Sequence, residues 1–213
     1  MKPLQSIAMG LVIVVLVARF HGYDALPDPV GWLLVLLGVR ALPPTVPHRD
    51  GLLWLAGLAG AVSAVVWFPA VTDALYDADA SLAWAANLPE VLFGALLCHA
   101  LAATADQAAL ESAGADRSAG ADRSAGADPK AARWLRLTRT GMLVVAVLPV
   151  LVFGAGLTSF EATSYVAAGL MAVLLICLLF TYAGRGWAVA GEAGAPSTTS
   201  GAAPPEGGTA PEA

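Results

Sequence analysis

Apolar residues form long segments along this chain, and short polar or low-complexity segments separate them. Six segments are predicted to be helices that enter a lipid bilayer, because each is apolar over most of its length. Their approximate bounds are 4–20, 29–42, 52–70, 88–104, 141–157 and 162–182. The pattern therefore predicts an all-α membrane protein that folds as a bundle of transmembrane helices.

The length of the second segment leaves the number of crossings open. A helix rises about 1.5 Å per residue, and the hydrocarbon core of a bilayer is about 30 Å thick. The 17 residues of 4–20 can just cross this core, whereas the 14 residues of 29–42 are short. We expect six transmembrane helices, or five together with one short re-entrant helix.

A turn that contains prolines and acidic residues joins the first two apolar segments. Pro27 and Pro29 prevent a continuous helix there and favour extended backbone at the residues before them. Asp28 is well placed to cap the second helix, with Pro29 at the first helical position. The two prolines and Gly31 form a structural motif, and Asp24 and Asp28 are the candidate functional residues of the turn.

Two further patterns concern the third segment and the loop after it. Ala56, Gly60 and Ala64 recur at every fourth residue, and such a ridge of small residues allows another helix to approach closely. Residues 71–87 form the longest predicted loop at their end of the bundle. A short interfacial helix is expected within this loop.

Capping patterns mark the predicted starts of two helices. Asn87 and Glu90 have the spacing of a capping box, and so do Thr158 and Glu161. The cap and the helix dipole account for both glutamates without a functional role. Pro149 lies in the middle of the fifth segment and is expected to kink it.

Two segments contain too few large apolar residues to bury a core. The hexamer Ser-Ala-Gly-Ala-Asp-Arg occurs at 112–117 and again at 118–123, and the end of the chain is rich in Gly, Pro, Ser, Thr and Ala. Both are predicted to be disordered. The expected organisation is helices 1–4 in 1–107, a low-complexity loop in 108–131, helices 5–6 in 132–190 and a disordered tail in 191–213.

Composition supports the membrane class and argues against several functions. Of the 213 residues, 58% are hydrophobic and 13% are charged, whereas about a quarter of the residues in a soluble domain are charged. The net charge of −5 and the lack of a basic reading motif argue against nucleic-acid binding. The sequence contains no nucleophile elbow, phosphate loop, HExxH or CxxC pattern, so it predicts no enzyme, no cofactor and no metal site.

Basic residues are distributed unevenly between the two sides of the predicted bundle. If all six segments span, one side carries ten of the eleven Lys and Arg residues and the other side carries only Arg19. This bias predicts that the repeat loop and the C-terminal tail are cytoplasmic and that the turn around Asp28 is extracytoplasmic. If the second segment is re-entrant, the first helix alone changes direction and Lys2 becomes the exception.

Three ionisable residues are candidates for chemistry. Asp24 and Asp28 lie four residues apart and could share a proton or a cation at the mouth of the first helical hairpin. Alternatively, Asp28 caps a helix and Asp24 caps a turn. His99 is predicted inside the fourth helix, where an ionisable side chain is costly and is a functional candidate by default. Its alternative role is that of a neutral imidazole bonded to a neighbouring helix, for example to Thr181.

The sequence Asp24-x-x-Pro27-Asp28-x-x-Gly31, followed by the apolar run 32–38, resembles a segment of uncharacterised small bacterial multi-pass integral membrane proteins. In these proteins an acidic, proline-containing turn after the first helix leads into a short glycine-containing helix. The resemblance covers only this stretch of the chain. It implies a location in the bacterial inner membrane and implies no activity.

These patterns lead us to expect a non-enzymatic accessory or interaction protein of the bacterial inner membrane. It would contact the lipid bilayer and a membrane-protein partner or further copies of itself, since packing and capping patterns are many and buried ionisable groups are few. The alternative is a small transporter or a cation-conducting oligomer that uses Asp24, Asp28 and His99. In that case the three side chains would line one cavity.

Overall fold

The computed structural model describes residues 2–16, 19–20, 23–24, 28–115, 129–154, 161–185 and 187. These residues form seven α-helices and one short antiparallel ladder. The elements are α1 Pro3–Val15, β1 Arg19–Phe20, β2 Tyr23–Asp24, α2 Asp28–Arg40, α3 Arg49–Val66, α4 Pro69–Ala78, α5 Ala80–Ala115, α6 Pro129–Gly154 and α7 Glu161–Tyr182. The predicted helical class is therefore confirmed, apart from the two-residue strands.

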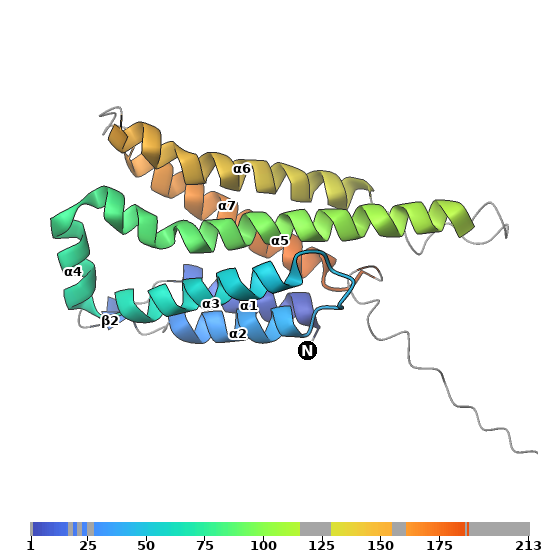
Figure 1. The fold of residues 1–213 in the computed structure, drawn as a ribbon, viewed down its shortest axis with the longest axis horizontal. Coiled ribbons are helices and arrows are strands. Elements are labelled where there is room, and N and C mark those ends of the chain that lie inside the picture. The colour runs from blue at the N-terminus through green and yellow to red at the C-terminus, as the bar shows by residue number, and fades with distance from the viewer. Residues whose placement is uncertain are drawn as a thin grey trace, which may run out of the picture.

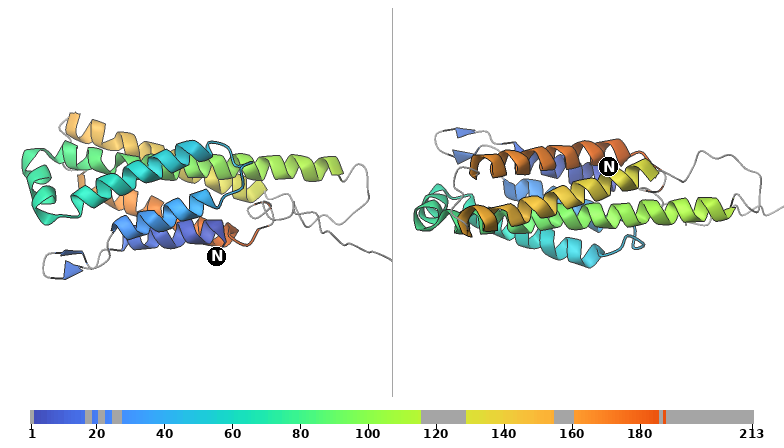
Figure 2. Two further views of the ribbon diagram at one scale, coloured as in Figure 1. Left: turned by 60° about the horizontal axis from the view of Figure 1, so that its bottom comes forward. Right: turned by 90° about the horizontal axis from the view of Figure 1, so that it is seen from above.

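The long helices lie along the long axis of the molecule, and consecutive long helices run in opposite directions (Figures 1 and 2). The N-terminus, the α2–α3 connection and the end of α7 lie together at one end of the bundle, and α4 and the β1–β2 ladder lie at the other end. We call the first the basic end, after Lys2, Arg40, Arg49, Arg133 and Arg185. We call the second the acidic end, after Asp28, Asp73, Asp77, Asp79 and Glu90.

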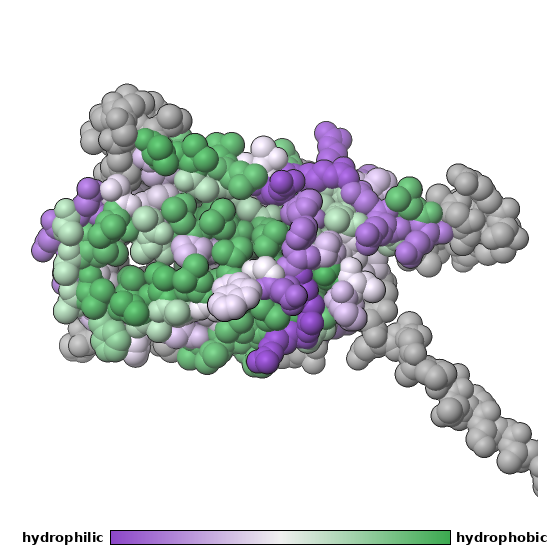
Figure 3. All heavy atoms as spheres, in the orientation of Figure 1, coloured by the Kyte–Doolittle hydropathy of each residue, from purple (hydrophilic) through white to green (hydrophobic). Residues whose placement is uncertain are grey.

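Three helices are long and apolar enough to cross a membrane, which supports a membrane protein. They are Arg49–Val66, Ser81–Glu111 and Ala162–Tyr182. Much of the molecular surface between the two ends is hydrophobic, and hydrophilic side chains gather toward the basic end (Figure 3). α1 and α2 have 13 residues each, which is about 20 Å of helix. A count of six crossings is therefore not confirmed.

Glycines allow α1 and α2 to pack closely. A Cβ added at Gly10 would lie 2.5 Å from the Gly31 carbonyl oxygen, and a Cβ added at Gly31 would lie 2.7 Å from the Gly10 carbonyl oxygen. The Ser6 hydroxyl donates a hydrogen bond to the Leu34 carbonyl across the same contact, at 3.0 Å. A side chain at position 31 would clash with the backbone of α1, so the acidic turn motif needs a glycine there for packing.

The predicted ridge of small residues on α3 is partly confirmed. Ala56 is fully buried, and a Cβ added at Gly60 would lie 3.1 Å from the Cβ of Trp32 on α2. Ala64 is exposed, so the ridge ends before it. The short helix expected after α3 is also confirmed, because α4 occupies Pro69–Ala78.

The start of α5 corrects the predicted start of the fourth transmembrane helix. The capping box expected at Asn87 was wrong, since α5 is continuous from Ala80 through Pro89. Inside the helix, Asn87 Nδ2 donates a hydrogen bond to the Ala83 carbonyl at 3.1 Å. Alanine is the strongest helix former, and the alanine-rich segment before Asn87 extends the helix beyond the apolar run.

α6 also begins earlier than predicted, at Pro129 instead of residue 141. Its first turns carry several basic residues, and Arg136 forms an ion pair with Asp106 of α5. α7 agrees with the predicted bounds 162–182. The conformation of Pro27, the proposed cap at Thr158, the repeat from residue 116 and the tail lie outside the described residues.

Candidate functional site: two cavities that share Glu90

A cavity of about 400 Å³ lies near the acidic end, and residues from α1 to α5 line it. We call it the acidic cavity. Its apolar wall includes Trp32 of α2 and Trp67, which follows α3. Its polar lining residues are Asp28, Ser63, Thr72, Asp73, Asn87 and Glu90.

Asp28, Asp73 and Glu90 give this cavity its charge. Asp28 lies in the first turn of α2, where the helix dipole favours a negative side chain. Glu90 belongs to α5, and its carboxyl group interacts electrostatically with that of Asp28. None of the described residues that line the cavity is Lys, Arg or His. The cavity is therefore a site of negative potential.

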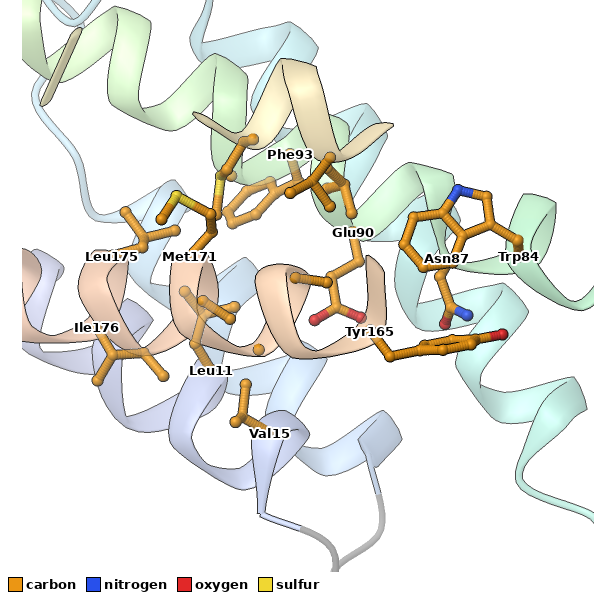
Figure 4. A pocket seen from close by; sticks show the side chains of 17 residues that line it. Leu11, Val15, Trp84, Asn87, Glu90, Phe93, Tyr165, Met171, Leu175 and Ile176 are labelled. Atoms are coloured by element: carbon orange, nitrogen blue, oxygen red, sulfur yellow. The ribbon is translucent and has the colours of Figure 1, made fainter. Parts of the chain in front are cut away.

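A second cavity, of about 230 Å³, lies between α1, α5, α6 and α7 (Figure 4). We call it the apolar cavity. Aliphatic, methionine and aromatic side chains form most of its wall, including Leu11, Phe93, Met142, Met171 and Leu175. Its few polar lining residues are Trp84, Asn87, Glu90 and Tyr165.

Asn87 and Glu90 line both cavities, so this turn of α5 forms part of the wall between them. In Figure 4 the Glu90 side chain extends from α5 toward α1 and α7, with its carboxyl group inside the apolar cavity. The wall also contains a buried aromatic pair. Trp32 lines the acidic cavity and Phe93 lines the apolar cavity, and their rings meet edge to face at 5.5 Å.

The Glu90 side chain is half-buried, and part of its surface faces the two cavities. In the described part of the chain no donor or cation contacts the Glu90 carboxyl group, and its charged neighbour there is the carboxyl group of Asp28. A carboxyl group held in this way is stabilised either by taking up a proton or by a cationic group beside it.

Aromatic side chains form the end of the apolar cavity beyond Asn87. The rings of Trp84 and Tyr165 lie 5.4 Å apart at an interplanar angle of 70° (Figure 4). Trp84 is buried, and its Nε1 has no hydrogen-bond acceptor among the described residues. The π faces of such rings attract cations, and their apolar surface packs against apolar chains.

The structure does not bring Asp28 and His99 together. His99 lines neither cavity. Its ring lies 5.5 Å from that of His48, which precedes α3 at the basic end. The Thr181 hydroxyl, named as a hydrogen-bond partner for His99, donates instead to the Cys177 carbonyl at 2.7 Å. Asp24 lies in β2, and its side chain is outside the described part of the structure.

Sequence reasoning did not identify Glu90 as a functional candidate, because the spacing to Asn87 explained it as a cap. The available signal was the same one that identified His99, an ionisable residue within an apolar run that enters the bilayer. No group of three or more His, Cys, Asp or Glu side chains among the described residues could hold a metal ion.

Comparison with protein-family models, with curated proteins and with solved structures finds no match to this chain.

Proposed function

We propose that this chain is a non-enzymatic, multi-pass protein of the bacterial inner membrane and that it binds a cationic ligand at its acidic end. The observation that carries the proposal is that three acidic residues, Asp28, Asp73 and Glu90, line one cavity whose described lining residues include no Lys, Arg or His. Carboxylates in such a site repel one another, and a bound cation reduces this repulsion.

The size and lining of the acidic cavity favour an organic cation over a metal ion. About 400 Å³ lies within the range of small-molecule sites, roughly 300–1,000 Å³. A metal ion needs a compact set of ligands, which the described residues do not supply. Trp67 adds an indole face, and such faces attract ammonium groups.

The proposed orientation follows from the distribution of charge between the two ends. Basic residues accumulate on the cytoplasmic side of bacterial membrane proteins, so the basic end faces the cytoplasm in this proposal and the acidic cavity faces outward. All helices except α4 then cross the bilayer, and the bilayer is thinned around the short α1–α2 pair. The proposal retains the accessory role expected from the sequence and adds that this role consists of recognising a ligand.

A binding titration tests this function. Methylammonium chloride would be added to the full chain in lipid nanodiscs at constant ionic strength, with tryptophan fluorescence as the signal because Trp32 and Trp67 line the cavity. We expect saturable binding, and we expect Asp28→Asn to weaken it about tenfold, since a charged hydrogen-bond partner is lost.

Asp77→Asn is the matched control. Asp77 is an exposed acid of α4 at the same end of the molecule, and it does not line the cavity. Its substitution should leave the affinity unchanged. Equal affinity of the wild type and Asp28→Asn would contradict the proposal.

A further inference from the structure

We infer that the ligand is an alkylammonium amphiphile, whose ammonium group binds at Glu90 and whose apolar chain occupies the apolar cavity. The inference rests on the proposed function, because it assumes that a cation binds at the acidic end. It adds the chemical class of the ligand and a second subsite between α1, α5, α6 and α7.

The first argument is the position of Glu90. Glu90 lines both cavities, and within the described part of the chain its carboxyl group has no cationic partner. An ammonium group placed there would face Asp28 from one side, while an attached chain would extend past Phe93 into the apolar cavity. One ligand can thus use the charge of one cavity and the apolar wall of the other.

The second argument is the chemistry of the apolar cavity. Small-molecule sites are mostly apolar with a few convergent polar groups, and this cavity places one carboxylate, one amide and one phenol among aliphatic and aromatic side chains. Its volume of about 230 Å³ equals roughly eight waters of about 30 Å³ each. A methylene group is of similar size, so the cavity suits a chain of about six to eight carbons better than a lipid acyl chain.

The third argument concerns the charge of the ligand. Neither cavity has a Lys, Arg or His among its described lining residues. The phosphate of an aminophospholipid would therefore lie close to carboxylates, and no Lys, Arg or His among the described lining residues would offset the repulsion. This favours a free alkylammonium ion over the headgroup of a membrane lipid.

The experiment compares three probes on the full chain in nanodiscs, with empty nanodiscs of the same lipid to subtract partitioning. Hexylammonium carries the charge and the chain, methylammonium carries the charge alone, and 1-hexanol carries the chain alone. We expect hexylammonium to bind at least about tenfold more tightly than methylammonium, because burial of methylene groups is favourable. We expect 1-hexanol to show no saturable binding.

Two variants locate the two parts of the ligand. Glu90→Gln keeps the shape of the side chain and should weaken hexylammonium binding about tenfold. Ala172→Leu narrows the apolar cavity and should remove the advantage of hexylammonium while methylammonium still binds, which also shows that the variant is folded. Val173→Leu, at an exposed neighbouring position outside the cavity lining, is the matched control.

The outcomes separate this inference from the proposed function. Equal affinity for hexylammonium and methylammonium would overturn the assignment of an amphiphilic ligand, and so would equal affinity for hexylammonium and 1-hexanol. The proposed cation site would then still be decided by the Asp28→Asn result. Competition by phosphatidylethanolamine in the nanodisc would overturn the assignment to a free alkylammonium ion. Loss of the chain-length advantage in Ala172→Leu, with its retention in Val173→Leu, supports the inference.

Discussion

Gly10 and Gly57 both lie in helix interiors, but only Gly10 is packed against another backbone. A Cβ at Gly10 would lie 2.5 Å from the Gly31 carbonyl oxygen, whereas a Cβ at Gly57 would meet nothing within 4 Å. Alanine is favoured over glycine inside a helix by about 1 kcal/mol, so Gly57→Ala should maintain or raise the melting temperature. Gly10→Ala forces α1 away from α2 and should lower the free energy of unfolding by about 1–3 kcal/mol.

Thermal unfolding in detergent, followed by circular dichroism, measures this difference. The two substitutions gain the same intrinsic helix propensity, so their difference reports the packing of α1 on α2. Equal melting temperatures for the two variants would show that the two helices are not in close contact at Gly10.

Single residues could be predicted where local geometry decides their role. Asp28 was expected to cap the second helix with Pro29 as the first helical residue, and α2 begins at Asp28 itself. Glu90 has the spacing of a capping residue, and only the packing of α1, α2 and α7 around α5 places it between two cavities. Local sequence does not encode that environment, so Asp28 was named as a candidate from the sequence and Glu90 was not.

At the scale of elements, the N-terminus of α5 is capped by Asp79. Its Oδ1 accepts a hydrogen bond from the Ser81 backbone N–H at 2.8 Å, and this bond lowers the pKa of the Asp79 carboxyl below its ordinary value. The stabilisation is therefore fully present above the ordinary pKa and is lost as the pH falls through the lowered pKa. Ser81→Pro removes the N–H, and proline is tolerated in the first turn of a helix.

We expect the pKa of Asp79 to rise toward its ordinary value in Ser81→Pro. A ¹³C NMR titration of the Asp79 carboxyl carbon measures the shift. Ser81→Ala is the control, because it keeps the backbone donor, and its effect should be smaller than that of Ser81→Pro. An unchanged titration in Ser81→Pro would exclude Asp79 as the cap of α5.

The apolar runs predicted where the helices lie along the chain, but they did not predict where α5 and α6 begin. The helices α2, α3 and α7 lie close to the predicted segments. The starts of α5 and α6 were missed, because alanine-rich and basic sequences form helices well but lie outside the long apolar runs from which the helices were predicted. Helix propensity continues each helix beyond the part that the bilayer would bury.

At the scale of the whole molecule, the antiparallel order of the helices places nearly all of the described basic residues at one end (Figure 1). The sequence predicts this arrangement, because each polar connection alternates between the two ends. The cavities depend on where neighbouring helices begin along the axis of the bundle and on which side chains meet between them. Those features arise only when helices far apart in the sequence pack together.

The proposed orientation makes a prediction for cysteine labelling in intact bacteria. In a background with Cys98→Ala and Cys177→Ala, a membrane-impermeant maleimide should label Asp77→Cys at the acidic end. It should label Lys2→Cys and Pro44→Cys at the basic end only after the inner membrane is permeabilised, since arginine and lysine are retained on the cytoplasmic side.

The two basic-end positions distinguish the two topologies. If α1 and α2 both cross the bilayer, Lys2→Cys and Pro44→Cys are protected to the same extent in intact cells. A re-entrant α2 would expose Lys2→Cys while Pro44→Cys stays protected, because α1 alone would change direction. Labelling of Pro44→Cys together with protection of Asp77→Cys in intact cells would invert the molecule and place the acidic cavity in the cytoplasm, which would contradict the outward-facing site.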